Sequence, residues 1–177
     1  MTPPRLVIRR ATPDDVPALA ELAANAFRDT YRELDDAADI EDHVTTQLTP
    51  AVFARHLEDP ASTLLVALDP DYVGYAHVKL SDAPPCVSGP APLELARLYL
   101  RQNSIGRGLG AALMRAVFDE ARRLQRETIW LGVYERNLHA REFYRRWGFA
   151  DVGTKEFLFG GRRYDDPVMA ARVPARG

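Results

Sequence analysis

Apolar and polar positions along the chain repeat with two different periods, and each change of period marks an expected element. Residues 93–100, LELARLYL, alternate as a half-buried strand does. Residues 12–31 instead place Val16, Ala20 and Phe27 on one helical face. By the same reasoning we expect strands at 5–10, 62–68, 72–80, 93–100, 128–133, 149–159 and 162–173.

Four helices are expected between these strands. The first begins at Thr12, a good N-cap, and Pro13 fits its first position. The others cover residues 50–59, the segment that starts near Leu109, and residues 137–148. Residues 29–42 are acidic and are expected to be irregular, and the proline-rich residues 81–92 to form a loop. The order β α α β β β α β α β β predicts an α/β fold with a mixed sheet.

Composition narrows the class of protein. A chain of 177 residues is expected to form a single domain, residues 1–177. Cys86 is its one cysteine, so an internal disulfide is excluded, and no apolar run approaches the roughly 18 residues of a membrane span. We therefore expect a cytoplasmic protein without a membrane or nucleic-acid partner. Charge is uneven: residues 1–100 hold 8 basic and 16 acidic residues, and residues 101–177 hold 15 and 9.

Three glycines in IGRGLGAALM, residues 105–114, stand between an expected strand and an expected helix. The start of a helix has unpaired N–H groups and a partial positive charge, so this position suits a phosphate or pyrophosphate. A P-loop is excluded because no Lys-Ser/Thr pair follows the last glycine. The dinucleotide pattern G-x-G-x-x-A does match at Gly106, Gly108 and Ala111, with Glu127 downstream. That alternative lacks the further βα repeats that a dinucleotide-binding sheet needs.

Two adjoining motifs resemble those of the GCN5-related N-acetyltransferase (GNAT) family. The first is LYLRQNSIGRGLGAALM, and the second is N-x-x-A-x-x-F-Y-x-x-x-G-F, which is complete from Asn137 to Phe149. One position departs from the family pattern, because Ile105 stands where Gln or Arg is usual. The resemblance implies a mixed, mostly antiparallel sheet flanked by helices on both faces.

The resemblance also implies acetyl-CoA as the acetyl donor. The backbone of Leu98 and Leu100 would contact the pantetheine arm, and Asn137 would lie near the sulfur end of the cosubstrate together with Tyr144. The pyrophosphate would be held by Gly106, Arg107, Gly108, Gly110 and Ala111.

Acetyl transfer to an amine calls for a base and an acid. The resemblance makes Tyr144 the acid that protonates the leaving thiolate, although this side chain could simply pack on its helix. Glu94 is the candidate base, because even spacing puts it on the strand face of Leu98 and Leu100, and His77 is an alternative. No histidine pair has the spacing of a metal site. We expect His43, His56 and His139 at the surface and no nucleophilic role for Cys86.

The identity of the amine that accepts the acetyl group is the least determined feature of the expected reaction. Residues 29–42 contain seven carboxylates and one basic residue, Arg32. The C-terminal motif looks like that of the polyamine-acetylating branch of the family. A cationic small amine such as a polyamine is therefore the first candidate acceptor. A protein N-terminus or lysine, or a CoA-binding module without catalysis, stays open. A homodimer is one alternative for the oligomeric state.

Overall fold

Seven strands form one sheet in the order β1-β2-β3-β4-β5-β7-β6 in the computed structural model, which describes residues 6–175. Strand β4 pairs with β5 in parallel, from Pro92 opposite Thr128 to Glu94 opposite Trp130. The pairs β1–β2, β5–β7 and β6–β7 are antiparallel, which confirms a mixed and mostly antiparallel sheet. The strands are β1 (Val7–Arg10), β2 (Ser62–Leu68), β3 (Tyr72–Lys79), β4 (Pro92–Leu100), β5 (Thr128–Gly132), β6 (Ala150–Phe159) and β7 (Arg162–Arg172).

Five α-helices accompany these strands in the described residues, one more than the sequence predicts. They are α1 (Val16–Tyr31), α2 (Ala37–Gln47), α3 (Pro50–Glu58), α4 (Leu109–Arg123) and α5 (Leu138–Arg146). Helix α2 occupies much of the acidic segment, so the expectation of irregular structure there is wrong. Ile40, Val44 and Leu48 are buried at four-residue spacing, and this narrow apolar stripe was masked by the charged residues around it.

The expected first helix divides into two parts. Residues Pro13–Asp15 form a 3-10 turn, η1, and the α-helix begins only at Val16. Asp15 is 2% exposed and accepts hydrogen bonds from Arg9 and from the Tyr72 hydroxyl. Asp15 is thus the centre of a buried network with Arg9 and Tyr72. The Arg5 end of the expected first strand lies outside the described residues.

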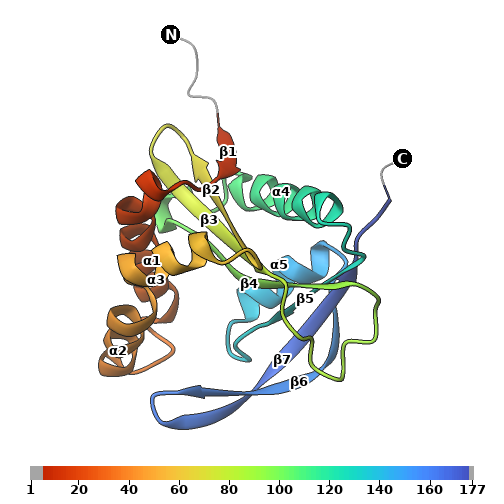
Figure 1. Cartoon of the computed structure of the whole chain (residues 1–177). Coiled ribbons are helices and arrows are strands. Elements are labelled where there is room, and N and C mark those ends of the chain that lie inside the picture. Colours follow the sequence, from red (N-terminus) through yellow and green to blue (C-terminus); the bar gives the residue numbers. More distant parts are fainter. Residues whose placement is uncertain (1–5, 176–177) are drawn as a thin grey trace. The chain divides into compact units, whose positions relative to one another are not determined.

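The chain divides into two compact units, the first of residues 1–78 and 97–117 and the second of residues 79–96 and 118–177. Strand β4 and helix α4 each begin in one unit and end in the other. In the first unit α1 packs against α2 and α3, and α3 packs against β2 (Figure 1). Val16, Leu19, Ala20, Ala23 and Phe27 are all buried, so the predicted apolar face of α1 is confirmed.

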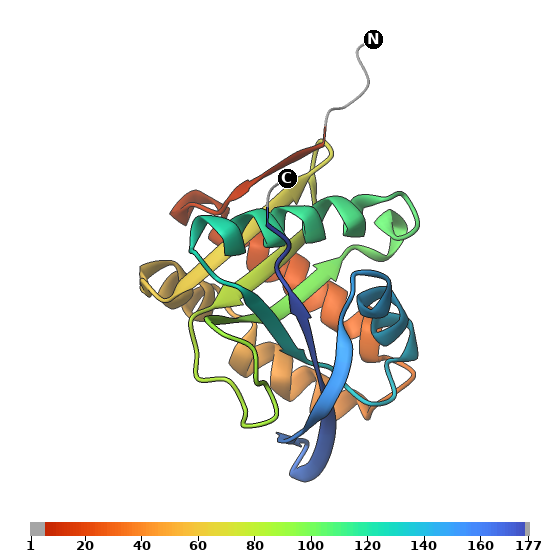
Figure 2. The same cartoon turned by 90° about the vertical axis from the view of Figure 1, so that its right-hand side faces the viewer.

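In the second unit, β7 lies between β5 and β6, and the β6–β7 pair forms a long hairpin (Figure 2). Gly160 and Gly161 close that hairpin with positive φ values of 58° and 71°. Two successive residues of positive φ match the twist of an antiparallel pair. Among residues 6–175, no helix combines the length and apolar character that a bilayer crossing requires.

Candidate active site

The glycine-rich loop before α4 needs glycine for its backbone conformation. Gly106 and Gly108 have φ values of +84° and +77°, in the left-handed region that side chains other than glycine rarely adopt. A Cβ built on either residue would meet nothing within 4 Å, so the space over the loop is open to a ligand. The Gly108 carbonyl accepts the N–H of Ala112 at 3.1 Å, inside the first turn of α4. The loop therefore leads directly into a helix N-terminus, as anion binding requires.

The side chains in and beside this loop offer little free positive charge to an anion. Arg107 donates to Asp69 at 2.7 Å, and its side chain is 53% exposed while that of Asp69 is 8% exposed. A phosphate would therefore share Arg107 with a carboxylate already in place. Ile105 is exposed and has no charge to add, so the backbone N–H groups of Gly108, Gly110 and Ala111 remain the main donors available to an anion.

Strand β4 presents different chemistry on its two faces. Leu98 and Leu100 are half-buried, and Leu100 lies against Gly74, where an added Cβ would come within 2.5 Å of Leu100 Cδ2. Arg97 and Tyr99 occupy the alternate positions. The Arg101 N–H donates to the Val73 carbonyl at 2.8 Å, which pins the end of β4 to β3.

Helix α5 holds the two predicted residues of the second motif. The Asn137 side chain accepts the N–H of Ala140 at 3.1 Å, so Asn137 is the N-cap of α5. Tyr144 is 9% exposed, and its ring packs edge-on against Phe143 and more obliquely against Phe149, with centroids 5.5 and 5.7 Å away. Tyr144 is thus packed between two aromatic rings at the C-terminal half of α5.

Phe143 and Trp147 help to hold α5 in place without being fully buried. Both side chains are half-buried, and Trp147 stacks on Phe118 with ring centroids 6.0 Å apart. Tyr144 is the more deeply buried ring because the helix turns this side toward Phe149.

Glu94 is half-buried on β4, and the Ser81 hydroxyl donates to its Oε2 at 2.6 Å. Ser81 thus fixes the orientation of this carboxylate and leaves Oε1 for another partner. His77, the alternative base, is 2% exposed, and its Nε2 lies 2.5 Å from Ser62 Oγ. Its ring also packs on His56 at 4.4 Å, so the surroundings of His77 are those of a core residue.

Comparison with known proteins decides the class. Residues 17–149 match the family model described as Acetyltransferase (GNAT) family. This chain belongs to the GNAT family. An uncharacterized N-acetyltransferase of Mycobacterium tuberculosis is 34% identical over 160 residues, which cover 90% of this chain and 98% of that protein. The crystal structure of the PaiA N-acetyltransferase of Thermoplasma acidophilum in complex with coenzyme A has a TM-score of 0.79 at 20% identity, with 95% and 99% of the two chains covered.

A third relative of the GNAT chain matches over a shorter stretch. A spermine/spermidine N(1)-acetyltransferase of Bacillus subtilis is 31% identical over 64 residues, 36% of this chain and 42% of that protein. The GNAT chain is an acetyl-CoA-dependent N-acetyltransferase, and acetyl-CoA is its cosubstrate. The open, left-handed glycine loop fits this cosubstrate, and the dinucleotide alternative is set aside.

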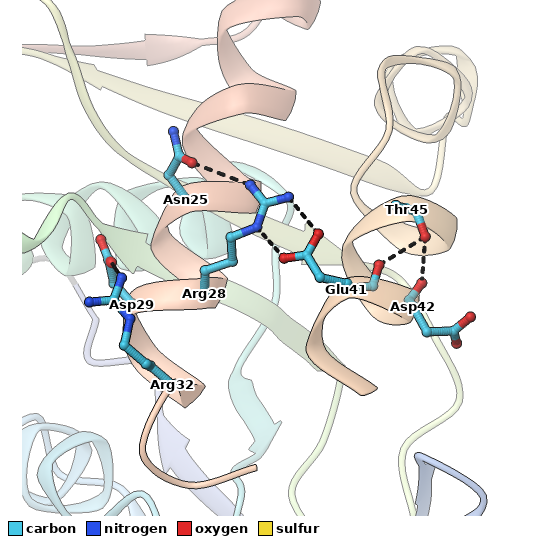
Figure 3. Close-up of polar contacts among 7 residues, drawn as sticks. All are labelled: Asn25, Arg28, Asp29, Arg32, Glu41, Asp42 and Thr45. Carbon is cyan, nitrogen blue, oxygen red and sulfur yellow. Dashed lines mark hydrogen bonds and ion pairs between the residues drawn. The ribbon is translucent and has the colours of Figure 1, made fainter. Parts of the chain in front are cut away.

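The acidic segment of the GNAT chain is partly neutralised by Arg28 of α1 and by Arg32, which follows the end of that helix (Figure 3). Arg28 forms two hydrogen bonds to Glu41, at 2.5 and 2.9 Å, and Arg32 pairs with Asp29 at 2.7 Å. The packing of α2 on α1 brings Glu41 beside Arg28, and Asp29 lies one helical turn before Arg32. Two of the seven carboxylates are therefore already paired with an arginine of this chain. The charge count from the sequence covered only residues 29–42, so it did not include Arg28.

Two histidines differ from the expectation of surface positions. His43 is half-buried and stacks on Phe27 at 4.4 Å, and His56 is half-buried between Phe53 and His77. Burial, with a further contribution from the Arg97 charge, lowers the pKa of His43 to about 4. His139 is exposed as expected. Among residues 6–175 no cluster of three metal-ligating side chains occurs.

One functional candidate of the GNAT chain was missed from the sequence. Asp166 on β7 is 7% exposed, and burial raises its pKa from 3.8 to about 6. Its register partner on β6 is Lys155, whose ammonium lies 5.3 Å from the centre of the Trp130 ring. The signal was available, since Asp166 precedes the apolar run PVMAA in a strand pattern.

Proposed function

We propose that this GNAT enzyme transfers the acetyl group by direct attack of a primary amine, with Glu94 as general base and Tyr144 as general acid. The amine nitrogen forms a bond to the thioester carbonyl carbon, and the carbon–sulfur bond breaks. The proton lost by the amine goes to Glu94, and the departing thiolate takes a proton from the Tyr144 hydroxyl. The products are an N-acetylated amine and free coenzyme A.

The need for a base follows from the pKa of amines. A lysine-like amine has a pKa near 10.4, so its neutral, nucleophilic form costs about 4.6 kcal/mol at pH 7. A carboxylate that receives the proton, directly or through a water, lowers this barrier. Glu94 supports the proposal most directly, because it is oriented by Ser81 at 2.6 Å and stays partly accessible.

Tyr144 and Glu94 can be tested by removing one functional group at a time. Tyr144→Phe keeps the ring contacts with Phe143 and Phe149 and removes only the hydroxyl. General acid–base help is typically worth about 10²–10⁴-fold, and a thiolate is already a fair leaving group. We therefore expect Tyr144→Phe to lower kcat at least about tenfold, and Glu94→Gln to lower it about 10²-fold, with melting temperature and acetyl-CoA affinity nearly unchanged.

Tyr164→Phe is the matched control, because Tyr164 is a half-buried tyrosine of the same unit that packs edge-on against Tyr134 at 5.6 Å. It should leave kcat unchanged. Unchanged turnover in Tyr144→Phe would mean that Tyr144 only packs, and that the thiolate takes its proton from water.

For the acceptor, we propose a small amine that carries positive charge. The carboxylates of α2 and of the turn before it support this class, since Asp36 and Asp42 are exposed. A polyamine is one member of the class, and a spermine/spermidine acetyltransferase is among the partial relatives. Acetylation of a peptide amine, with no small amine accepted, would replace this class by a protein acceptor.

A further inference from the structure

One face of the sheet in the second unit carries the proposed base together with a primary amine. Glu94 on β4 lies directly opposite Trp130 on β5, and Trp130 lies opposite Ala170 on β7. Directly opposite residues share a face of a sheet, and residues two or four apart along one strand share it too. Asp166 is therefore on the face of Ala170, and so is Lys155, the register partner of Asp166 on β6. We call Glu94, Trp130, Lys155 and Asp166 the Lys155 face.

The Lys155 side chain reaches from the edge strand β6 across β7 to β5. A Cβ added to Gly132 would come within 3.4 Å of Lys155 Cδ and 3.8 Å of its Nζ. The ammonium lies 5.3 Å from the centre of the Trp130 ring, and Trp130 is the register partner of Glu94. Within residues 6–175 no carboxylate forms an ion pair with this ammonium. The amine is thus held at the strand that borders the proposed base, and no salt bridge must break before it reacts.

Two buried polar atoms of the Lys155 face have no hydrogen-bond partner in the described part of the chain. They are Nε1 of Trp130, a residue that is 2% exposed, and Oδ1 of Asp166, which is 7% exposed. Buried polar groups are nearly always paired, so each atom indicates a missing partner. The indole N–H can only donate and a carboxylate oxygen accepts, whereas an ammonium has donors only. A secondary amide has one acceptor and one donor, which is the complement of these two atoms.

We propose that the enzyme acetylates its own Lys155, and that the amide formed pairs with Trp130 and Asp166. This proposal rests on the proposed function, because it uses the same thioester and the same base.

The Lys155 ammonium first loses a proton to Glu94, directly or through a water, and Glu94 passes this proton to solvent. The neutral nitrogen then forms a bond to the thioester carbonyl carbon, and the carbon–sulfur bond breaks. The nitrogen gives up one further proton as the departing thiolate takes one up. Coenzyme A leaves as the free thiol, and Lys155 keeps an uncharged acetamide.

The chain permits a direct assay because it contains only two lysines, Lys79 and Lys155. Both are half-buried and belong to the same unit, so Lys79 reports the uncatalysed reaction with acetyl-CoA. The purified protein is incubated with isotope-labelled acetyl-CoA and no amine, and peptide mass spectrometry follows the label at each lysine. We expect Lys155 to be labelled at least about tenfold faster than Lys79, and Glu94→Gln to slow the labelling of Lys155 alone about 10²-fold.

Further variants test the site itself. Lys155→Arg keeps the positive charge and should reduce the label to the slow reaction at Lys79, whereas Lys79→Arg should leave the labelling of Lys155 unchanged. Wild type acetylated at Lys155 should melt about 2–4 °C above the unmodified protein, because the amide pairs two buried atoms. Trp130→Phe keeps a ring, removes the indole N–H and should reduce this gain. No gain in wild type would mean that a water pairs with the two atoms, and would overturn the placement of the amide.

The outcomes separate this proposal from the proposed function. Normal turnover of free amines with no label at Lys155, or with equal label at both lysines, would overturn self-acetylation and leave acetyl transfer intact. Labelling of Lys155 that Glu94→Gln does not slow would also overturn it, because the reaction would then be uncatalysed. A wild-type protein that acetylates neither free amines nor Lys155 would overturn the proposed function, and this proposal with it.

Discussion

Replacing Gly108 by alanine tests the glycine loop, and Gly161 supplies a matched control. Gly108 has a φ of +77° and Gly161 a φ of +71°, and a Cβ on either would meet nothing within 4 Å. The direct cost of alanine is therefore backbone strain without a clash in both cases. An L-residue in left-handed backbone costs about 1–2 kcal/mol. Part of this cost is offset because alanine has less conformational freedom than glycine in the unfolded chain.

Both variants should lose about 1 kcal/mol of stability, which lowers the melting temperature by about 2–4 °C in a chain of this size. Only Gly108→Ala should also weaken acetyl-CoA binding, because its Cβ enters the open space over the loop and the strain shifts the backbone N–H groups away from the pyrophosphate. We expect the Kd for acetyl-CoA to rise at least about tenfold, which corresponds to about 1.4 kcal/mol. Calorimetric titration gives the Kd, and thermal unfolding gives the stability.

The comparison of the two variants excludes a general effect of instability. Gly161→Ala, with equal strain in the β6–β7 turn, should bind acetyl-CoA as wild type does. If Gly108→Ala is destabilised like Gly161→Ala and binds acetyl-CoA with unchanged affinity, the loop does not hold the pyrophosphate.

Two further predictions concern stability and pH. Asp166 has its pKa raised to about 6 by burial, so its charged form destabilises the fold above that pH and the penalty disappears as the pH falls toward 4. Each unit of pKa shift corresponds to about 1.4 kcal/mol, and partial solvent access reduces this free energy. Asp166→Asn should therefore raise the melting temperature at pH 7.5 by about 3–6 °C. An equal gain at pH 4.5 would refute this explanation. Asp15 has its pKa lowered, first by Arg9, so its stabilisation is present above pH 4 and is lost below it. Asp15→Asn should cost about 2 kcal/mol at pH 7 and remove part of the acid sensitivity in thermal unfolding, and a variant as stable as wild type would show that the buried network with Arg9 and Tyr72 adds nothing.

Local signals in the sequence predict the elements whose chemistry is local. The glycines Gly106 and Gly108 lie between a strand and the start of a helix, as their place in the pattern predicts, and the helix expected over residues 137–148 is present as α5. The predicted strands all occur, with ends within a few residues of the observed ones. These features depend on neighbours in the chain, so the pattern contains them.

The features that the sequence did not reveal depend on residues far apart. Asp15 accepts a hydrogen bond from Tyr72, 57 positions away in the chain, and nothing in the local pattern announces that contact. His43 looks like a surface residue until α1 brings Phe27 onto its ring. The buried surroundings of Asp166 likewise exist only after the strands pair. Spacing along the chain indicates candidate residues, whereas the burial and the partners of a residue depend on the fold.

The proposed reaction moves an acetyl group from acetyl-CoA to a small primary amine. The most direct measurement is release of free thiol from acetyl-CoA with the panel of lysine, ornithine, cadaverine, putrescine, spermidine and a lysine peptide, together with mass analysis of the products. We expect amine-dependent thiol release, one N-acetylated small amine for each thiol, and a loss of at least about tenfold in Tyr144→Phe. Binding of acetyl-CoA with no amine-dependent thiol release across the panel would contradict it and would leave a CoA-binding module without catalysis.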